Sequence, residues 1–344
     1  MLIRCLKTWG RVYYFASNFE NAKHKAQEAE RLCSSGSHNH SSLHAGILTD
    51  LSELYRLQGS LNEAEASYQK ALELHKVTND VLGQGGDHLG LGDIYLRLNR
   101  LDEAEASFTN ALKYHRMVNS SLGEGHDHRG LGNVYSRLNR MGEAEASFKN
   151  ALKFHKIANN TLGEGNDYER LGDTYLRSNR LSEAEASYKS ALELHKVANN
   201  VLGQGNDHSG LGDTYLKLNR LNEAESSYQS ALEFHTIANN ALGQGKDHRG
   251  LGDINLKLGR LDEAEASYRC ALEMHKISND LLSQGTDLHG LGKVHMEKSQ
   301  LEGAKSMFEK ALVMHKKAQA PIWQSLDQKY LNEVLSKMGQ ASQK

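Results

Sequence analysis

The chain is poor in the residues that interrupt helices and in those that cross-link secreted proteins. It has 344 residues but only one proline, Pro321, so helices can run through almost its whole length without a break. Its three cysteines, Cys5, Cys33 and Cys270, show no metal-ligand spacing and no even pairing. This usage suits a reducing compartment, and we therefore expect a cytoplasmic protein.

Long apolar runs and a strong net charge are also missing. No apolar segment approaches the length that crosses a bilayer, and charged residues interrupt the apolar start, which makes a poor signal peptide. The formal net charge is −2 with 24% charged residues, so no global field attracts nucleic acid. The composition therefore predicts neither a membrane partner nor a nucleic-acid partner.

What the sequence has in abundance is internal repetition with a period of 40 residues. Five copies align without an insertion or deletion: 81–120, 121–160, 161–200, 201–240 and 241–280. Weaker copies flank them at 41–80 and 281–320. Such a period is typical of an array that buries one face of each unit against its neighbour. We expect a single array over 1–344, with a divergent first repeat at 7–38, seven repeats over 41–320 and a capping helix at 321–344.

Each copy carries two stripes of side chains at helical spacing. In one copy a first stripe contains Leu91 and Tyr95, a second contains Ala104 and Phe108, and a break at Asn99 separates them. Three columns recur in all seven copies: Ala64, Ala104, Ala144, Ala184, Ala224, Ala264 and Ala304; Tyr68, Phe108, Phe148, Tyr188, Tyr228, Tyr268 and Phe308; and Ala71, Ala111, Ala151, Ala191, Ala231, Ala271 and Ala311. We expect two antiparallel helices per repeat, packed through small residues and one aromatic.

The order Leu-Gly-x-x-Tyr, alanine, aromatic, alanine at these offsets resembles the tetratricopeptide repeat from Leu51 to Ala311. The resemblance implies an all-α protein, a right-handed α-solenoid or superhelix of helix-turn-helix repeats. It also implies a non-catalytic scaffold that holds a protein or an extended peptide ligand in its concave groove. The period is longer than the family's usual length of about 34 residues. The family's late proline is absent, and Arg116 stands in its place in one copy.

The longer repeat resembles two kinds of extended array. Leu-Gly-Glu-Gly before Leu-Gly-Asn-Val-Tyr is similar to the repeats of Pins-type spindle-orientation adaptors, and the near-identical copies are similar to arrays of basidiomycete fungi. Such fungal arrays often follow a nucleoside-triphosphatase switch domain of the NACHT or NB-ARC kind. The resemblance therefore implies an alternative function, that of a sensor or autoinhibitory array in a larger switch protein. Self-association is left open.

Two recurrent motifs resemble chemical sites but fit structural roles better. Glycine-rich segments such as Leu82–Asp87 lack the Lys-Ser/Thr ending of a phosphate loop, and we expect them to allow close helix packing. Asp87, which precedes His88, is expected at the start of a first helix, where its charge meets the helix dipole. A motif copied in every repeat argues for structure, and we expect neither a catalytic site nor a cofactor.

A histidine column contains His75 and its copies every 40 residues. We expect these side chains near the end of each second helix, where an imidazolium meets the helix dipole favourably. Adjacent repeats are too far apart for one column to supply several ligands to one metal ion. Sites that combine two columns stay open, but no spacing matches a known metal motif.

In this family the first helices line the groove, so recognition residues are sought opposite their packing stripe. One polar row there consists of Arg129, Glu169, Ser209, Arg249 and His289. A second consists of Asp93, Asn133, Asp173, Asp213 and Asp253, and a third of Arg97, Arg137, Arg177, Lys217 and Lys257. The leucines beside them suit a peptide with spaced apolar anchors. We predict these peptide-binding residues: Arg129, Asn133, Arg137, Arg170, Asp173, Arg177, Asp213, Lys217, Arg249, Asp253 and Lys257.

The groove rows have a simpler alternative explanation. Asp93 and Arg97 are four residues apart and can pair on one exposed helix face without any ligand. The family's carboxylate-clamp pattern is not met, because Arg170 replaces its asparagine and Asn206 with Gly210 replaces its basic pair. The aspartates of the second row favour basic or amide-rich partners.

Overall fold

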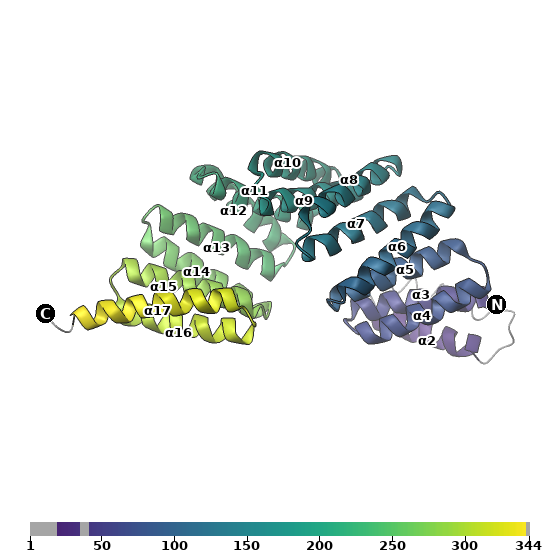
Figure 1. The fold of residues 1–344 in the computed structure, drawn as a ribbon, viewed down its shortest axis with the longest axis horizontal. Helices are drawn as coiled ribbons and strands as arrows, with labels where there is room; N and C mark the ends of the chain where they lie inside the picture. The colour runs from purple at the N-terminus through teal and green to yellow at the C-terminus, as the bar shows by residue number, and fades with distance from the viewer. Residues whose placement is uncertain (1–18, 35–40, 342–344) are drawn as a thin grey trace. The chain divides into compact units, whose positions relative to one another are not determined.

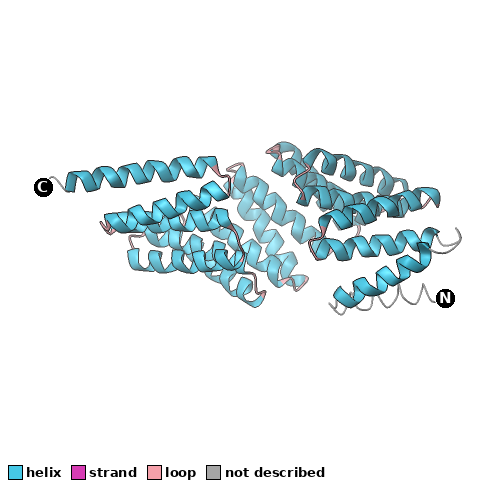
Figure 2. Cartoon of the chain, turned by 90° about the horizontal axis from the view of Figure 1, so that it is seen from below, coloured by secondary structure: helices cyan, strands magenta, loops and turns pink. Residues whose placement is uncertain are grey.

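The computed structural model describes residues 19–34 and 41–341. These ranges contain sixteen helices and no strand (Figures 1 and 2), which confirms the expected all-α fold. The first helices of the repeats are α3 (Ser41–Leu57), α5 (Val81–Arg97), α7 (Ser121–Arg137), α9 (Thr161–Arg177), α11 (Val201–Lys217), α13 (Ala241–Lys257), α15 (Leu281–Glu297) and α17 (Pro321–Ala341). The second helices are α4 (Leu61–Val77), α6 (Leu101–Met117), α8 (Met141–Ile157), α10 (Leu181–Val197), α12 (Leu221–Ile237), α14 (Leu261–Ile277) and α16 (Leu301–Lys317), and α2 (Phe19–Ser34) precedes α3.

From α3 onward, consecutive helices are joined by short turns that contain one residue with a left-handed backbone. Asn99, between α5 and α6, has a φ of 59°. Asparagine holds this place in most of the turns, and Gly59 and Gly259 hold it in two others. Both residue types adopt this conformation with little strain. Asn119 also has this conformation, and the residue that caps the next helix is Ser120.

The first helices begin at a capping side chain. Asp80 Oδ1 accepts a hydrogen bond from the backbone N–H of Gly83 at 2.9 Å, which satisfies one of the unpaired donors at the start of α5. Because α5 starts at Val81, Asp87 lies in the middle of the helix. This corrects the expectation that Asp87 marks a helix start. The glycine-rich segment is helical although glycine has a low intrinsic helix propensity.

The glycines of the first helices make room for the aromatic column. A Cβ atom on Gly92 of α5 would lie 2.7 Å from the ring of Phe108, and one on Gly130 of α7 would lie 2.4 Å from the same ring. Phe108 is 0% exposed, so its ring is enclosed between two neighbouring first helices. This confirms that small and large residues in fixed columns hold the helix pairs together.

The chain divides into two compact units, Met1–Asp167 and Tyr168–Lys344, here called the N-terminal unit and the C-terminal unit. Inside each unit, successive helices pack against one another, and neighbouring first helices also touch. In the C-terminal unit α11 contacts α13, α13 contacts α15, and α15 contacts α17 (Figure 1). The first helices of each unit therefore form a shared wall, on which the predicted recognition rows lie.

The last described helix packs on the final repeat. In α17, Leu331 and Val334 are 9% and 0% exposed and belong to a cluster with Phe308. That 321–344 forms a capping helix stays a prediction. Of the divergent first repeat at 7–38, α2 is described and buries Ala22, whereas Trp9 and the other apolar residues expected before it lie outside the described residues. No described helix is both long and apolar enough to cross a membrane.

Candidate functional site

A buried histidine near the end of each second helix is bonded to an aspartate of the next first helix. His195 Nδ1 lies 2.6 Å from Asp207 Oδ2, and both side chains are fully buried. The pair recurs in seven places: His75–Asp87, His115–Asp127, His155–Asp167, His195–Asp207, His235–Asp247, His275–Asp287 and His315–Asp327. The aspartate, and not the helix dipole, is therefore the main partner of these histidines, which corrects the expectation from the sequence.

A third residue, from the preceding first helix, faces the other oxygen of several of these aspartates. Arg249 Nη1 lies 3.9 Å from Asp287 Oδ1. Thr49, Arg129 and His289 hold the same place, with a nitrogen or oxygen atom 2.8 Å, 3.8 Å and 2.8 Å from Oδ1 of their respective aspartates. In these four repeats the column supplies the buried aspartate with a hydrogen bond, from Thr49 or His289, or with a nearby positive charge, from Arg129 or Arg249.

This column includes the first recognition row predicted from the sequence, and most of that row is hidden. Glu169, Ser209 and His289 are 7%, 1% and 6% exposed. The side chains of Arg129 and Arg249 are 22% and 24% exposed. The row therefore does not form an open ligand-facing surface, because its side chains lie between helices. A role for Arg129 and Arg249 in ligand binding stays a prediction.

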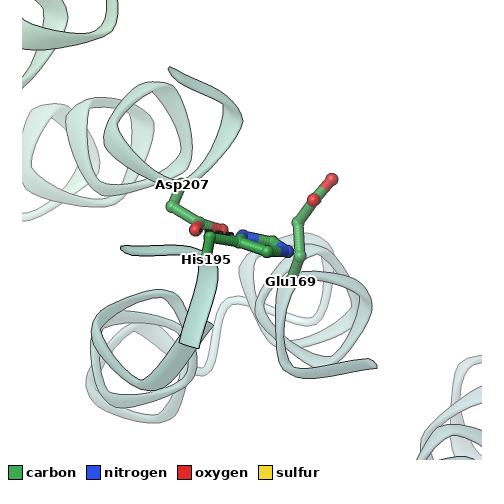
Figure 3. A group of neighbouring side chains, drawn as sticks. All are labelled: Glu169, His195 and Asp207. Atoms are coloured by element: carbon green, nitrogen blue, oxygen red, sulfur yellow. Dashed lines mark hydrogen bonds and ion pairs between the residues drawn. The ribbon is translucent and has the colours of Figure 1, made fainter. Parts of the chain in front are cut away.

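Glu169 is the acidic member of this column, and it lies close to one of the buried pairs. In Figure 3, the carboxylate of Asp207 lies beside one ring nitrogen of His195, and Glu169 is on the other side of the imidazole. Ligand atoms of the three residues all lie within 4.8 Å of one another, which makes them the candidate metal group among the described residues. The three residues occupy different repeat positions, so the cluster combines columns, which is the kind of site that the sequence left open.

The electrostatics of this cluster favour a bound proton. Burial raises the pKa of Asp207 to about 7 and also raises the pKa of Glu169. Burial alone would lower the pKa of His195, but the hydrogen bond to Asp207 and the two nearby carboxylates outweigh it and raise that pKa. A zinc ion needs about four ligands at roughly 2.0–2.3 Å, whereas His195 Nδ1 is already bonded to Asp207. The geometry therefore fits a buried proton-holding cluster better than a metal centre.

The second recognition row is tied to the aromatic column by hydrogen bonds. The hydroxyl of Tyr188 donates to Asp173 Oδ1 at 2.7 Å. The next two repeats have the same bond, Tyr228 to Asp213 and Tyr268 to Asp253, each at 2.5 Å. These aspartates are half-buried at the edge of the wall, where one oxygen is held by the protein itself.

The third row binds backbone carbonyls of neighbouring helices. Arg137 Nη1 donates to the carbonyl oxygen of Leu96 at 2.6 Å, and Lys217 Nζ donates to that of Leu176 at 3.0 Å. These carbonyls lie in the last turn of a first helix, where each also accepts the backbone N–H of the turn asparagine, Asn99 or Asn179, and carries a partial negative charge. Both cations therefore link adjacent first helices, which differs from the pairing along one helix that was the alternative explanation.

Two adjoining cavities open on the first-helix wall of the C-terminal unit. One, of about 650 Å³, is lined by residues that include Leu216, Lys217, Asp253, Leu256, Lys257 and Lys293. The other, of about 520 Å³, is lined by residues that include Arg249, Asp253, Tyr268, Lys293, Trp323 and Tyr330. Because both are lined by Asp253 and Lys293, they form one groove along α11, α13, α15 and α17, here called the C-terminal groove.

The structure distributes the predicted peptide-binding residues between the two units. Arg129, Asn133 and Arg137 belong to the N-terminal unit, and the other eight belong to the C-terminal unit: Arg170, Asp173, Arg177, Asp213, Lys217, Arg249, Asp253 and Lys257. The C-terminal groove brings together four of these, Lys217, Arg249, Asp253 and Lys257.

Lys293 lies at the centre of the C-terminal groove, and the sequence analysis missed it. It occupies the same repeat position as Asp253, one period later. The available signal was a reversal of charge in a column that is otherwise acidic or amide-bearing from Asp93 onward. Shared residue types in a column do not reveal a position, such as 293, that departs from them once.

Family models of the tetratricopeptide repeat match residues 44–80, 86–157, 128–196, 166–237 and 209–276, which together make up more than half of the chain. The chain belongs to the tetratricopeptide repeat family. Its helix pairs, glycine columns and aromatic column are those that the family pattern predicts. No curated protein matches the sequence.

Several solved structures share this tetratricopeptide repeat fold. A Rap protein complexed with Competence and Sporulation Factor is similar over 98% of this chain and 99% of its own, with a TM-score of 0.63 and 12% identity. The Rap conjugation gene regulator of plasmid pLS20, in complex with the Phr* peptide, is similar over 79% and 74%, with a TM-score of 0.56 and 17% identity. A STAND signal transduction ATPase with a tetratricopeptide repeat sensor, from Pyrococcus horikoshii, is similar over 91% of this chain and 52% of its own, with a TM-score of 0.62 and 17% identity. At these identities the likeness shows the fold alone.

Proposed function

We propose that the chain is a non-catalytic scaffold that binds an extended peptide segment of a partner protein in the C-terminal groove. The observation that carries this proposal is the pair of adjoining cavities that share Asp253 and Lys293. A groove lined by charged side chains and by Leu216 and Leu256 offers hydrogen-bonding groups together with apolar contacts. We propose a cytoplasmic location as well, because the cysteine usage of the sequence suits a reducing compartment.

The structural neighbours add support from fold alone. Two Rap structures are complexes, one with Competence and Sporulation Factor and one with the Phr* peptide. Those ligands belong to those proteins. What supports the proposal is that chains of this fold form complexes with a factor and with a peptide. Arg129, Asn133 and Arg137 offer a second candidate surface, which lies on the N-terminal unit.

A selection from random dodecapeptides displayed on phage tests the proposal. The wild-type chain should enrich a defined set of peptides. The double variant Lys217→Glu and Lys257→Glu should bind these peptides at least tenfold more weakly, because both lysines line the groove. The matched control is Lys196→Glu with Lys276→Glu, which changes two exposed lysines at equivalent places on the second helices α10 and α14. Enriched peptides that bind the groove variant normally and lose affinity for the control would refute the groove as the site.

A second candidate function is that of a sensor array in a larger switch protein of the NACHT or NB-ARC kind. The observation that favours it is the likeness to the STAND ATPase, whose printed description includes a tetratricopeptide repeat sensor. The resemblance of the 40-residue repeat to basidiomycete arrays agrees with this role, whereas its resemblance to Pins-type adaptors agrees with the first proposal. Sequencing full-length transcripts separates the two, since a sensor array would be read in frame with a nucleotide-binding domain.

A further inference from the structure

The aspartates on the wall of the C-terminal unit are already engaged by the protein. Besides its bond from Tyr188, Asp173 pairs with Arg170 at 3.2 Å. Besides its bond from Tyr228, Asp213 pairs with Lys246 at 2.9 Å. A carboxylate that already has two partners gains little from a basic ligand, which would have to displace an internal cation. These contacts argue against the basic partner that the sequence favoured.

The cations of the C-terminal groove are less fully engaged. Lys293 is half-buried, and within the described residues it has neither a hydrogen bond nor an ion pair; Asp253 is its electrostatic neighbour. Lys217 has a bond to the Leu176 carbonyl, which occupies one of the three donors of its ammonium group. Lys257 is exposed.

The balance of charge in the groove is the reverse of that of the whole chain. Four cationic side chains line the two cavities, Lys217, Arg249, Lys257 and Lys293, against two acidic ones, Asp253 and Glu297. The whole chain has a net charge of −2. The hydroxyl of Tyr268 donates to Asp253. Lys246, the cation that pairs with Asp213, is replaced one repeat later by the uncharged Thr286. Arg249 also faces the buried Asp287 at 3.9 Å, but the three lysines alone outnumber Asp253 and Glu297, so the groove presents a small excess of positive charge.

We infer that the C-terminal groove selects an acidic extended peptide, with carboxylates on Lys217, Lys257 and Lys293 and apolar side chains beside Leu216 and Leu256. This inference rests on the proposed peptide-binding function and names the class of its ligand. Axes of contacting helices lie about 8–10 Å apart, and an extended chain rises about 3.3 Å per residue. Lys217 and Lys257 occupy the same position on contacting helices α11 and α13. The ligand therefore has acidic residues about three positions apart, with apolar residues between them.

The groove suits a peptide better than a nucleic acid, because it combines charged side chains with apolar surface. Leu216, Leu256 and Leu261 line the same cavity as the lysines and offer apolar contacts that suit peptide side chains and not a phosphate backbone. Nucleic-acid affinity comes mainly from the neutralisation of many phosphates, for which the small excess of positive charge in the groove does not suffice.

The test uses the full chain and the composition of peptides from the displayed library, followed by fluorescence anisotropy with a synthetic probe of four Glu-Ser-Leu repeats. Selected peptides that depend on Lys217 and Lys257 should be rich in Asp and Glu at three-residue spacing. The probe should bind at least tenfold more tightly than the matched Lys-Ser-Leu and Gln-Ser-Leu peptides. Lys293→Glu should weaken its binding at least tenfold, Lys293→Gln should weaken it severalfold, and Lys293→Arg should retain it. Lys276→Glu, on the second helix α14, should change it less than twofold.

Each alternative result has a defined meaning. Groove-dependent peptides that are basic or neutral would overturn the acidic-ligand inference and leave the scaffold proposal standing. The same holds if Lys293→Glu and Lys293→Gln bind the acidic probe like the wild type while circular dichroism shows that both are folded. A single-stranded dodecamer of thymidine that competes more strongly than the probe would replace the peptide with a nucleic acid. If no selected peptide depends on the groove lysines, the scaffold proposal itself falls.

Discussion

The choice between tyrosine and phenylalanine in the aromatic column follows the residue fifteen positions earlier. Tyrosine occurs where that residue is an acid, as in the Tyr188–Asp173 pair. Phenylalanine occurs where that earlier residue is Asn133 or Lys293, because neither side chain is a carboxylate that needs a hydroxyl donor. Asp93 is the exception, because the aromatic residue fifteen positions later is Phe108, which has no hydroxyl. Three arginines are the electrostatic neighbours of Asp93 instead. Apart from Asp93, a hydroxyl in this column thus marks the first helices that have an acidic residue at this position.

Residue-level electrostatics also predict the pH dependence of folding. The pKa of Asp207 is raised to about 7 in the folded chain, above its ordinary value. A carboxyl with a raised pKa stabilises the fold most below its unfolded pKa, and this contribution is lost as the pH rises through about 7. Asp207→Asn cannot ionise, yet its amide oxygen still accepts the bond from His195. Between about pH 5 and pH 8, the variant should therefore lose less unfolding free energy than the wild type, by on the order of 2 kcal/mol.

Urea unfolding followed by circular dichroism at several pH values measures this difference. Asp287→Asn is the matched control. Asp287 has the same repeat position as Asp207, but the basic Arg249 faces it, whereas the acidic Glu169 lies close to Asp207. The control should flatten the pH dependence less than Asp207→Asn does. Equal curves for the wild type and Asp207→Asn would show that the cluster of Glu169, His195 and Asp207 does not hold a proton near neutral pH.

At the scale of a helix, the sequence predicted the pairs well and the start of the first helices badly. The break at Asn99 was placed correctly because asparagine is among the residues that most readily adopt a left-handed backbone. Asp87 was placed at a helix start because its charge would meet the helix dipole there, whereas α5 starts at Val81 and includes the glycines before Asp87. What makes them helical is tertiary packing: the Cβ of any larger residue at Gly83 would lie 2.6 Å from the ring of His75. Propensity alone cannot register a contact with a different helix.

Two glycines on α5 test this account because they differ in what surrounds them. A Cβ on Gly90 would lie 2.3 Å from the Tyr68 ring, so Gly90→Ala should destabilise the chain by about 1–3 kcal/mol through overpacking. A Cβ on Gly86 would meet nothing within 4 Å, so Gly86→Ala should stabilise it by about 0.5–1 kcal/mol through helix propensity and a less flexible unfolded chain. Urea midpoints of the two variants give the signs. A shift of the same sign for both would mean that close packing does not explain these glycines.

For the molecule as a whole, the 40-residue period was enough to predict the family and the fold, but not the site. Column identity shows which residues are equivalent, whereas their exposure depends on the rotation of each helix against its neighbours. Ser209 was assigned to an open recognition row and is 1% exposed. Lys293 was overlooked although it lines both cavities of the C-terminal groove. A repeat pattern therefore identifies the structural residues directly, and it hides a groove residue such as Lys293 that breaks the pattern once.

The order of helices in the array is specified by contacts that span one repeat boundary, and a deletion can test this. Removing 201–240 brings Asp247 twelve residues after His195, so the buried pair is rebuilt along with the asparagine cap and the glycine contacts. Such a chain should stay helical and unfold only a few degrees below the wild type, because a solenoid depends mainly on nearest neighbours.

Removing only 201–220 places one second helix after another and brings Ser227 to the place of Asp207. His195 then loses its carboxylate and the aromatic column loses its glycine wall, so this chain should unfold or aggregate. Circular dichroism melts and size-exclusion chromatography distinguish the two outcomes. If the shorter deletion melted as high as the longer one, generic helix packing, and not the histidine–aspartate and glycine–aromatic contacts, would determine the order of the helices.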